Sequence, residues 1–117
     1  MPKQVLIVHA DVETVKLLQY RLEAVGYTVS KTGDGEQGLE LLRSVKPDAV
    51  VLGSEMPGLG GYEFLIKGKD AKILSPETVF VLAENERMKT LFSLEGVSAY
   101  VKRPWNIDAL IERINAA

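Results

Sequence analysis

The sequence of 117 residues contains no cysteine, one histidine and one tryptophan. Without cysteine the chain has no disulfide and no thiolate metal ligand, which favours a reducing compartment such as the cytoplasm. No apolar run approaches the roughly 20 residues of a membrane-spanning helix, and residues 1–3 lead directly into an apolar segment. We therefore expect a cytoplasmic chain with no membrane association and no signal peptide.

The sequence also lacks an excess of charge, with a formal net charge of −2 and a pI near 5.4. Binding to nucleic acid needs a basic face, so we do not expect it. Hydrophobic residues make up 46% of the chain, which is enough for one core. Residues 1–117 are expected to form a single domain, either alone or as the first domain of a longer protein.

Short apolar segments alternate with amphipathic ones along the chain, a pattern typical of a parallel sheet covered by helices. Strands are predicted at 5–8, 27–31, 49–52, 78–82 and 100–101. Right-handed crossovers between them give an α/β fold: a flavodoxin-like, doubly wound (βα)5 three-layer sandwich. The parallel strands are expected in the order 2-1-3-4-5.

Each predicted strand is followed by apolar residues at helical spacing. Asp11 and Asn106 stand where helix N-caps belong, and Gly26 and Gly96 stand where helices end. The fourth helix is expected to begin after Asn85. In such a fold the functional site lies beyond the carboxyl ends of the strands.

The sequence VVLGSEMPG at residues 50–58, followed by Gly61, has a counterpart in a known family, as do Glu95-Gly96 and Arg103-Pro104-Trp105. From Val5 to Ile114 the chain resembles the CheY-like receiver domains of bacterial response regulators. The resemblance implies the flavodoxin-like fold, a role in two-component or phosphorelay signal transduction, and a cis peptide before Pro104.

The resemblance also implies a magnesium and phosphoryl site, and here most of its residues are replaced. The places of the acidic pair that holds magnesium are taken by His9 and Ala10, and the place of the phosphoaccepting aspartate by Gly53. Ala83 replaces the Thr or Ser of the switch, and Arg103 replaces the Lys. Only the cation survives, which predicts a degenerate pseudo-receiver that neither is phosphorylated at the usual site nor binds magnesium.

Four further residues are expected next to this pocket: Asp11, Ser54, Glu55 and Lys102. Asp11 and Glu55 either hold a cation together or serve as a helix cap and a solvated carboxylate. Ser54 or Asp11 is a candidate substitute phosphoacceptor. The rim is expected to be close to neutral or mildly positive, which leaves regulation by a small ligand or ion open.

His9 is either a phospho-carrier or a packed polar residue that makes local hydrogen bonds. The chain has no thiol and no evident pair of a nucleophile and a base, so we do not expect an enzyme.

Tyr100 matches the aromatic switch position of the family, and the resemblance places partner binding on helix four, strand five and helix five. The residues expected on this face are Arg87, Met88, Lys89, Thr90, Phe92, Tyr100, Lys102 and Glu112. Met88 and Phe92 either form an exposed apolar anchor or serve the core at helical spacing. We expect protein–protein interaction here with a signalling partner, and a homodimer stays open.

Overall fold

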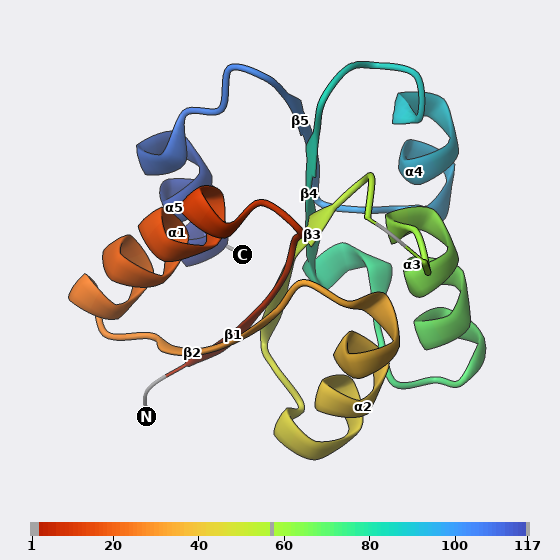
Figure 1. Ribbon diagram of the computed structural model, residues 1–117, viewed down its shortest axis with the longest axis horizontal. Coiled ribbons are helices and arrows are strands. Elements are labelled where there is room, and N and C mark those ends of the chain that lie inside the picture. Colours follow the sequence, from red (N-terminus) through yellow and green to blue (C-terminus); the bar gives the residue numbers. More distant parts are fainter. Residues whose placement is uncertain (1–2, 57, 117) are drawn as a thin grey trace.

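The computed structural model describes residues 3–56 and 58–116. Five parallel strands form one sheet in the order β2-β1-β3-β4-β5 (Figure 1). The strands are β1 (Gln4–Val8), β2 (Thr28–Thr32), β3 (Ala49–Gly53), β4 (Val79–Ala83) and β5 (Ala99–Lys102). The predicted flavodoxin-like α/β fold and its strand order are confirmed.

Helices cover both faces of this sheet. They are α1 (Val12–Ala24), α2 (Gly35–Val45), α3 (Gly61–Asp70), α4 (Lys89–Glu95) and α5 (Ile107–Ala116), and a 3₁₀ turn, η1 (Pro76–Thr78), precedes β4. Figure 1 shows α1 and α5 on one face and α2, α3 and α4 on the other. Two hydrophobic cores result, one under each layer of helices.

Most of the predicted helix caps are found at the ends of helices in the structure. Asp11 caps α1 by accepting the backbone N–H of Glu13 (3.3 Å). Gly26 and Gly96 take positive φ angles of 97° and 91° after α1 and α4. Asn106 accepts the N–H of Ala109 (3.0 Å) at the start of α5.

The fourth helix begins later than predicted, at Lys89. Asn85 accepts the backbone N–H of Arg87 (2.9 Å), so it caps a turn that precedes the helix. Strands β2 and β4 each begin one residue later than expected. For β4 the reason is the 3₁₀ turn, in which the Thr78 hydroxyl donates to the Ser75 carbonyl (2.7 Å).

The strand ends converge at one edge of the sheet. Strands β3 and β4 are buried at every position, and Gly53 lies in register with Leu82. The N–H of His9 donates to the Thr32 carbonyl (3.0 Å), and the N–H of Arg103 donates to the Ala83 carbonyl (3.1 Å). The residues that follow β1, β3, β4 and β5 therefore meet, as the parallel topology predicts.

Two further predictions can be compared with the backbone. The peptide between Arg103 and Pro104 is cis, as the resemblance implied. Within residues 3–56 and 58–116, none of the helices has the length and apolarity needed to cross a bilayer.

Candidate functional site

The ring of His9 fills the space in front of Gly53. His9 follows β1 and is only 6% exposed. A Cβ atom at position 53 would lie 2.9 Å from Cδ2 and 3.2 Å from Cγ of this ring. Real Cβ atoms essentially never make a contact as short as 2.9 Å, so any residue larger than glycine must push the imidazole away. The position that matches the phosphoacceptor is therefore covered from within the protein.

Local contacts hold the His9 ring in this place. Its Nδ1 atom accepts the backbone N–H of Asp11 (3.1 Å), so the neutral ring carries its proton on Nε2. Burial lowers the pKa of His9 below its usual 6.5. The negative charges of Asp11 and Glu84 oppose this shift, and Arg103 adds to it. His9 is thus a packed, neutral residue with local hydrogen bonds.

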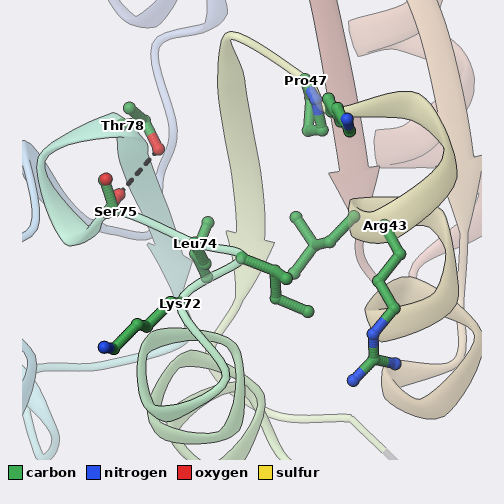
Figure 2. A pocket seen from close by; sticks show the side chains of 9 residues that line it. Arg43, Pro47, Lys72, Leu74, Ser75 and Thr78 are labelled. Carbon is green, nitrogen blue, oxygen red and sulfur yellow. Dashed lines mark hydrogen bonds between the residues drawn. The ribbon is translucent and has the colours of Figure 1, made fainter.

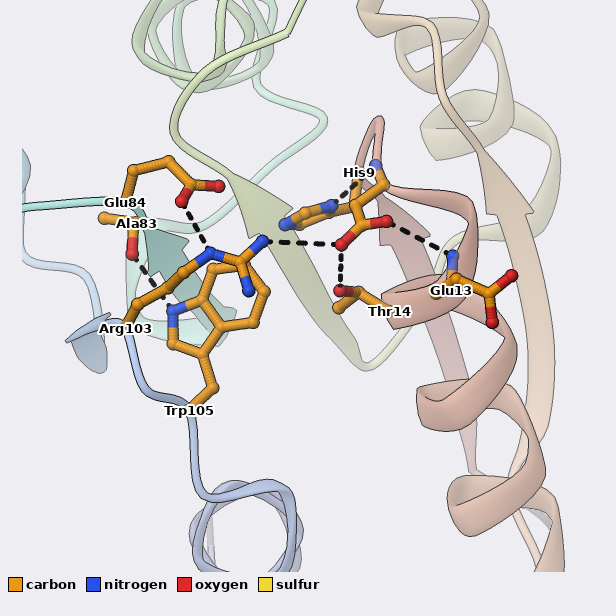
Figure 3. Close-up of polar contacts among 8 residues, drawn as sticks. His9, Glu13, Thr14, Ala83, Glu84, Arg103 and Trp105 are labelled. Atoms are coloured by element: carbon orange, nitrogen blue, oxygen red, sulfur yellow. Dashed lines mark hydrogen bonds and ion pairs between the residues drawn. The ribbon is translucent and has the colours of Figure 1, made fainter.

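Trp105 covers the other side of the imidazole. The two rings meet edge to face, with centroids 5.3 Å apart and an angle of 84°. The indole Nε1 donates to the Ala83 carbonyl (3.0 Å), which fixes the ring above the end of β4. The guanidinium of Arg103 lies 4.0 Å from the indole centroid, within cation–π range. Figure 3 shows His9, Trp105 and Arg103 gathered at the strand ends.

Arg103 binds carboxylates from two other loops. Its Nε atom donates to Glu84 (2.6 Å), and a terminal nitrogen donates to Asp11 (3.4 Å) (Figure 3). The hydrogen bond from Arg103 to Glu84 raises the pKa of the guanidinium. The surviving cation of the site is thus engaged with protein carboxylates.

The carboxylate of Asp11 is also fully engaged. It accepts the Thr14 hydroxyl (2.6 Å) and the Glu13 N–H (3.3 Å) besides Arg103. The hydrogen bond from Thr14 is the main reason why the pKa of Asp11 is lowered. The carboxylate of Asp11 therefore caps α1, forms a salt bridge and accepts a side-chain hydrogen bond at the same time.

The donor set at this end of the sheet does not fit magnesium. Magnesium takes oxygen ligands in near-octahedral geometry, whereas Ala10 offers no side-chain donor and His9 offers a nitrogen that is already bonded. Glu55 pairs with Arg87 (3.2 Å). Within residues 3–56 and 58–116, no three His, Asp or Glu side chains are grouped to hold a metal ion.

The charges on the rim are paired, and their balance corrects a sequence prediction. Lys102 pairs with Glu86 (3.7 Å), in addition to the pairs of Arg87 and Arg103. The carboxylates are Asp11, Glu55, Glu84 and Glu86, and the cations are Arg87, Lys102 and Arg103. With four acidic groups against three basic ones the rim is slightly acidic, and the prediction of a neutral or mildly positive rim omitted Glu84 and Glu86.

Ser54 and Ala83 complete the edge. Ser54 is half-buried, and its N–H donates to the Leu82 carbonyl (3.1 Å). Ala83 is 1% exposed and contributes only its carbonyl, which Trp105 occupies. The position of the switch hydroxyl thus has no side-chain donor.

A small pocket of about 290 Å³ lies beside His9, between the ends of β1 and β2 and the start of α1. Its lining includes Ala10, Val12, Lys16, Lys31 and Thr32.

Comparison with known proteins assigns the family. Residues 5–115 match the sequence model of the response regulator receiver domain. The chain belongs to this family. It is 32% identical over 117 residues to the alkaline phosphatase synthesis transcriptional regulatory protein PhoP of Bacillus subtilis (strain 168), covering 99% of this chain and 48% of that protein. It is 27% identical over 122 residues to the polar-differentiation response regulator DivK of Brucella anthropi, covering 99% and 96%.

This receiver domain spans about half the length of the first curated relatives that it matches. Among solved structures, it is similar to the receiver domain of the Francisella response regulator 1452, with a TM-score of 0.87, 25% identity and coverage of 97% and 94%. It also shares its fold with the receiver domain of the sensor histidine kinase PA1611 from Pseudomonas aeruginosa PAO1 (TM-score 0.87, 18% identity, coverage 99% and 97%), whose structure has magnesium in the active-site cleft.

Tyr100, which matches the aromatic switch position of the family, packs toward α4. Its hydroxyl donates to the Asn85 carbonyl (2.8 Å), and its ring centroid lies 5.7 Å from that of Phe92. The ring is half-buried on the face of the sheet that α4 covers. Tyr100 thus ties β5 to the loop that follows β4.

The predicted partner face needs one correction. Phe92 is 0% exposed and Met88 is half-buried, because both point from the same side of α4 into the core. Of the two alternatives for Phe92, the core position is confirmed and the place on the partner face is wrong. Leu91 and Leu94, which are 44% and 77% exposed, are the apolar residues that α4 presents. Exposed polar residues of this face are Arg87, Lys89, Thr90, Lys102 and Glu112.

Three residues of the site were not assigned to it from the sequence: Thr14, Glu84 as an ion-pair partner, and Trp105 in contact with His9. The signals were present but weak. Glu84 directly follows the buried strand β4, and Trp105 is the single tryptophan, two residues after the conspicuous cation Arg103. Thr14 lies three residues after the helix cap Asp11, a spacing at which side chains meet.

Proposed function

We propose that this receiver domain is not phosphorylated at the usual position and acts in two-component signalling through protein–protein contact. The observation that carries the proposal is the His9 ring, which lies where the side chain of a phosphoacceptor at position 53 would project. Arg103, the remaining cation, is bound by Glu84 and Asp11. The proposal includes the absence of magnesium binding, of enzymatic activity and of nucleic-acid binding by this domain, and a cytoplasmic location.

Incubation with acetyl phosphate, followed by intact-mass spectrometry, tests this proposal. We expect no phospho-adduct with or without magnesium, while a receiver domain with its aspartate intact is labelled in parallel. A stable adduct would overturn the proposal. Its position would be mapped with Ser54→Ala and Asp11→Asn, because these residues are the candidate substitute acceptors.

The contact surface that we propose lies on α4, β5 and α5. Leu91 and Leu94 are exposed there beside Arg87 and Lys89, and an apolar anchor surrounded by charge is common at protein interfaces. Leu94→Glu should lower the affinity of the domain for its signalling partner. If the partner is a second copy, sedimentation velocity should show a dimer that this substitution dissociates.

A second candidate function is regulation by a small ligand in the pocket of about 290 Å³ beside His9. The specific observation is that two cations, Lys16 and Lys31, line it. A thermal-shift screen with metals and small anions tests it, because a ligand that binds only the folded state raises the melting temperature. An increase that Lys31→Ala abolishes would favour this candidate.

A further inference from the structure

A larger pocket lies at the amino ends of the strands, remote from the site described above. It has a volume of about 660 Å³, and its lining comes from the end of α2 and from the segment between α3 and β4. Figure 2 shows Arg43 on α2 and Pro47 on one side of the pocket, Lys72, Ser75 and Thr78 of the segment after α3 on the other side, and Leu74 between them. The proposed function makes no use of this pocket.

The lining combines positive charge with an apolar floor. Three of the residues are cationic, Arg43, Lys46 and Lys72, and none of the nine is acidic. In the described part of the chain, none of these three cations takes part in an ion pair. Leu42 and Leu74, at 2% and 8% exposure, form buried parts of the lining. Such a pocket suits an anion that also carries an apolar group.

Two of these cations occupy unfavourable backbone conformations. Lys46 has a φ of 53° and Lys72 a φ of 60°, and they are the two non-glycine residues with positive φ in residues 3–56 and 58–116. Glycine takes such conformations without steric penalty, and the chain uses glycine at three other positive-φ positions. Lysine at both positions is therefore not explained by the backbone.

The helix dipole explains only part of this charge. Cations are favoured at a helix C-terminus, which accounts for Arg43 in the last turn of α2. The dipole also favours a cation at Lys46, the C-cap of α2, and at Lys72, which follows the C-cap of α3. Both helices already carry cations in their last turn, so the dipole does not require a further lysine at two strained positions that border the same pocket. Backbone strain that persists in this way is characteristic of functional sites.

We propose that this pocket binds a phosphorylated small molecule of nucleotide size, with its phosphates on Arg43, Lys46 and Lys72 and its apolar body over Leu42 and Leu74. The volume of about 660 Å³ falls within the range of small-molecule sites. Arginine and lysine are the side chains that bind phosphate groups best.

Titration of the ¹⁵N-labelled chain with ATP in magnesium-free buffer, followed by amide chemical shifts, tests this proposal. We expect saturable shifts at Leu74, Ser75 and Thr78 and none at His9 or Gly53. The double variant Lys46→Gly/Lys72→Gly should bind about tenfold more weakly, because two charges are lost. Its melting temperature should stay equal or rise, because both positive-φ positions then carry glycine.

Lys67→Gln is the matched control, since Lys67 is exposed on α3 and does not line the pocket. It should leave the affinity within twofold of that of the unaltered chain. Inorganic tripolyphosphate is the control ligand and should bind more weakly than ATP, because it has no apolar body.

Four outcomes would overturn the proposal. They are the absence of saturable shifts, shifts centred on His9, equal affinity for tripolyphosphate and ATP, and a joint loss of affinity and melting temperature in the double variant. The last outcome would show that the two lysines serve the fold. None of these outcomes bears on phosphorylation at position 53, so this proposal and the proposed function fail separately.

Discussion

The two ends of the sheet differ in how tightly side chains fill them and in whether their charged groups are paired. At the carboxyl end, side chains fill the space and neutralise one another: His9 covers Gly53, and Arg103 binds Glu84 and Asp11. At the amino end, a pocket of about 660 Å³ is lined by three cations and no acidic residue. The difference teaches that side chains close the carboxyl end of this fold, whereas the cations at the amino end take part in no ion pair among residues 3–56 and 58–116.

The largest effect is expected from Gly53→Asp, which forces a side chain into the space of His9. The new Cβ would meet the imidazole at 2.9 Å within a fully buried strand. We expect the free energy of unfolding to fall by about 3 kcal/mol, through overpacking and a buried carboxylate. Urea denaturation followed by circular dichroism measures it, and acetyl phosphate should still not label the variant.

The double variant His9→Ala/Gly53→Asp is the control for this prediction. Removing the ring opens the space, so the aspartate should cost less in the His9→Ala background than in the unaltered chain. An equal cost in both backgrounds would show that His9 does not obstruct position 53.

A smaller loss, about 2 kcal/mol, is expected from Trp105→Ala. The substitution removes the ring that meets His9 edge to face and the hydrogen bond to the Ala83 carbonyl. Trp105→Phe keeps a ring and loses only the hydrogen bond, so it should cost about 1 kcal/mol. If both variants lost the same free energy of unfolding, the contact between the rings would contribute nothing to stability.

Protonation of His9 should lower the stability of the folded chain below about pH 6.5. Burial lowers the pKa of His9 in the folded chain, so the unfolded chain binds this proton first as the pH falls. Stability should therefore decrease as the pH falls below the usual His pKa of 6.5. Melting temperatures between about pH 7.5 and 5 measure this effect, and His9→Gln should remove it.

Asp11 titrates in a separate, more acidic range. Its pKa is lowered from 3.8, mainly by the Thr14 hydroxyl, so its contribution is present above that value and is lost as the pH falls through the folded pKa. Thr14→Val should therefore change stability in the acidic range and leave the decrease near pH 6.5 unaltered. A change of the upper step in this variant would contradict the assignment of that step to His9.

The smallest effect is expected at the amino end and has the opposite sign. Lys46→Gly relieves a φ of 53° and should raise the free energy of unfolding by about 0.5 kcal/mol. Lys16→Gly, the same exchange inside α1, should lower it by about 1 kcal/mol. If Lys46→Gly instead lowered the free energy of unfolding, Lys46 would stabilise the fold. The amino end would then not differ from the carboxyl end in this respect.

The fold was predictable because its signals are local and repeated. Alternating apolar and amphipathic segments indicated a parallel sheet covered by helices, right-handed crossovers gave the strand order, and the caps Asp11 and Asn106 marked helix starts. Boundaries failed where a turn imitates a helix signal, as at Asn85, which caps a turn ahead of α4, whose first residue is Lys89. Phe92 stayed open between core and surface because so few apolar residues determine the register of a seven-residue helix only weakly.

The sequence allowed us to predict which residues lie at the site, but not which side chains contact one another there. Parallel topology brings Gly53, Ala83 and Arg103 to one edge whatever their side chains are. The contact between His9 and Trp105 joins residues far apart in sequence and depends on how two side chains turn. The larger pocket was not predictable either, because it arises from two segments whose charges have no sequence pattern in common.

The single tryptophan of the chain lies between a histidine that titrates and an arginine that bridges two loops. Indole emission responds to charge and to water around the ring. Trp105 is therefore an intrinsic fluorescent reporter at the carboxyl end of the sheet, and no label has to be added. Docking of a partner, movement of Arg103 or entry of an anion beside His9 should each change the emission spectrum, so tryptophan fluorescence follows changes at this end of the molecule in real time.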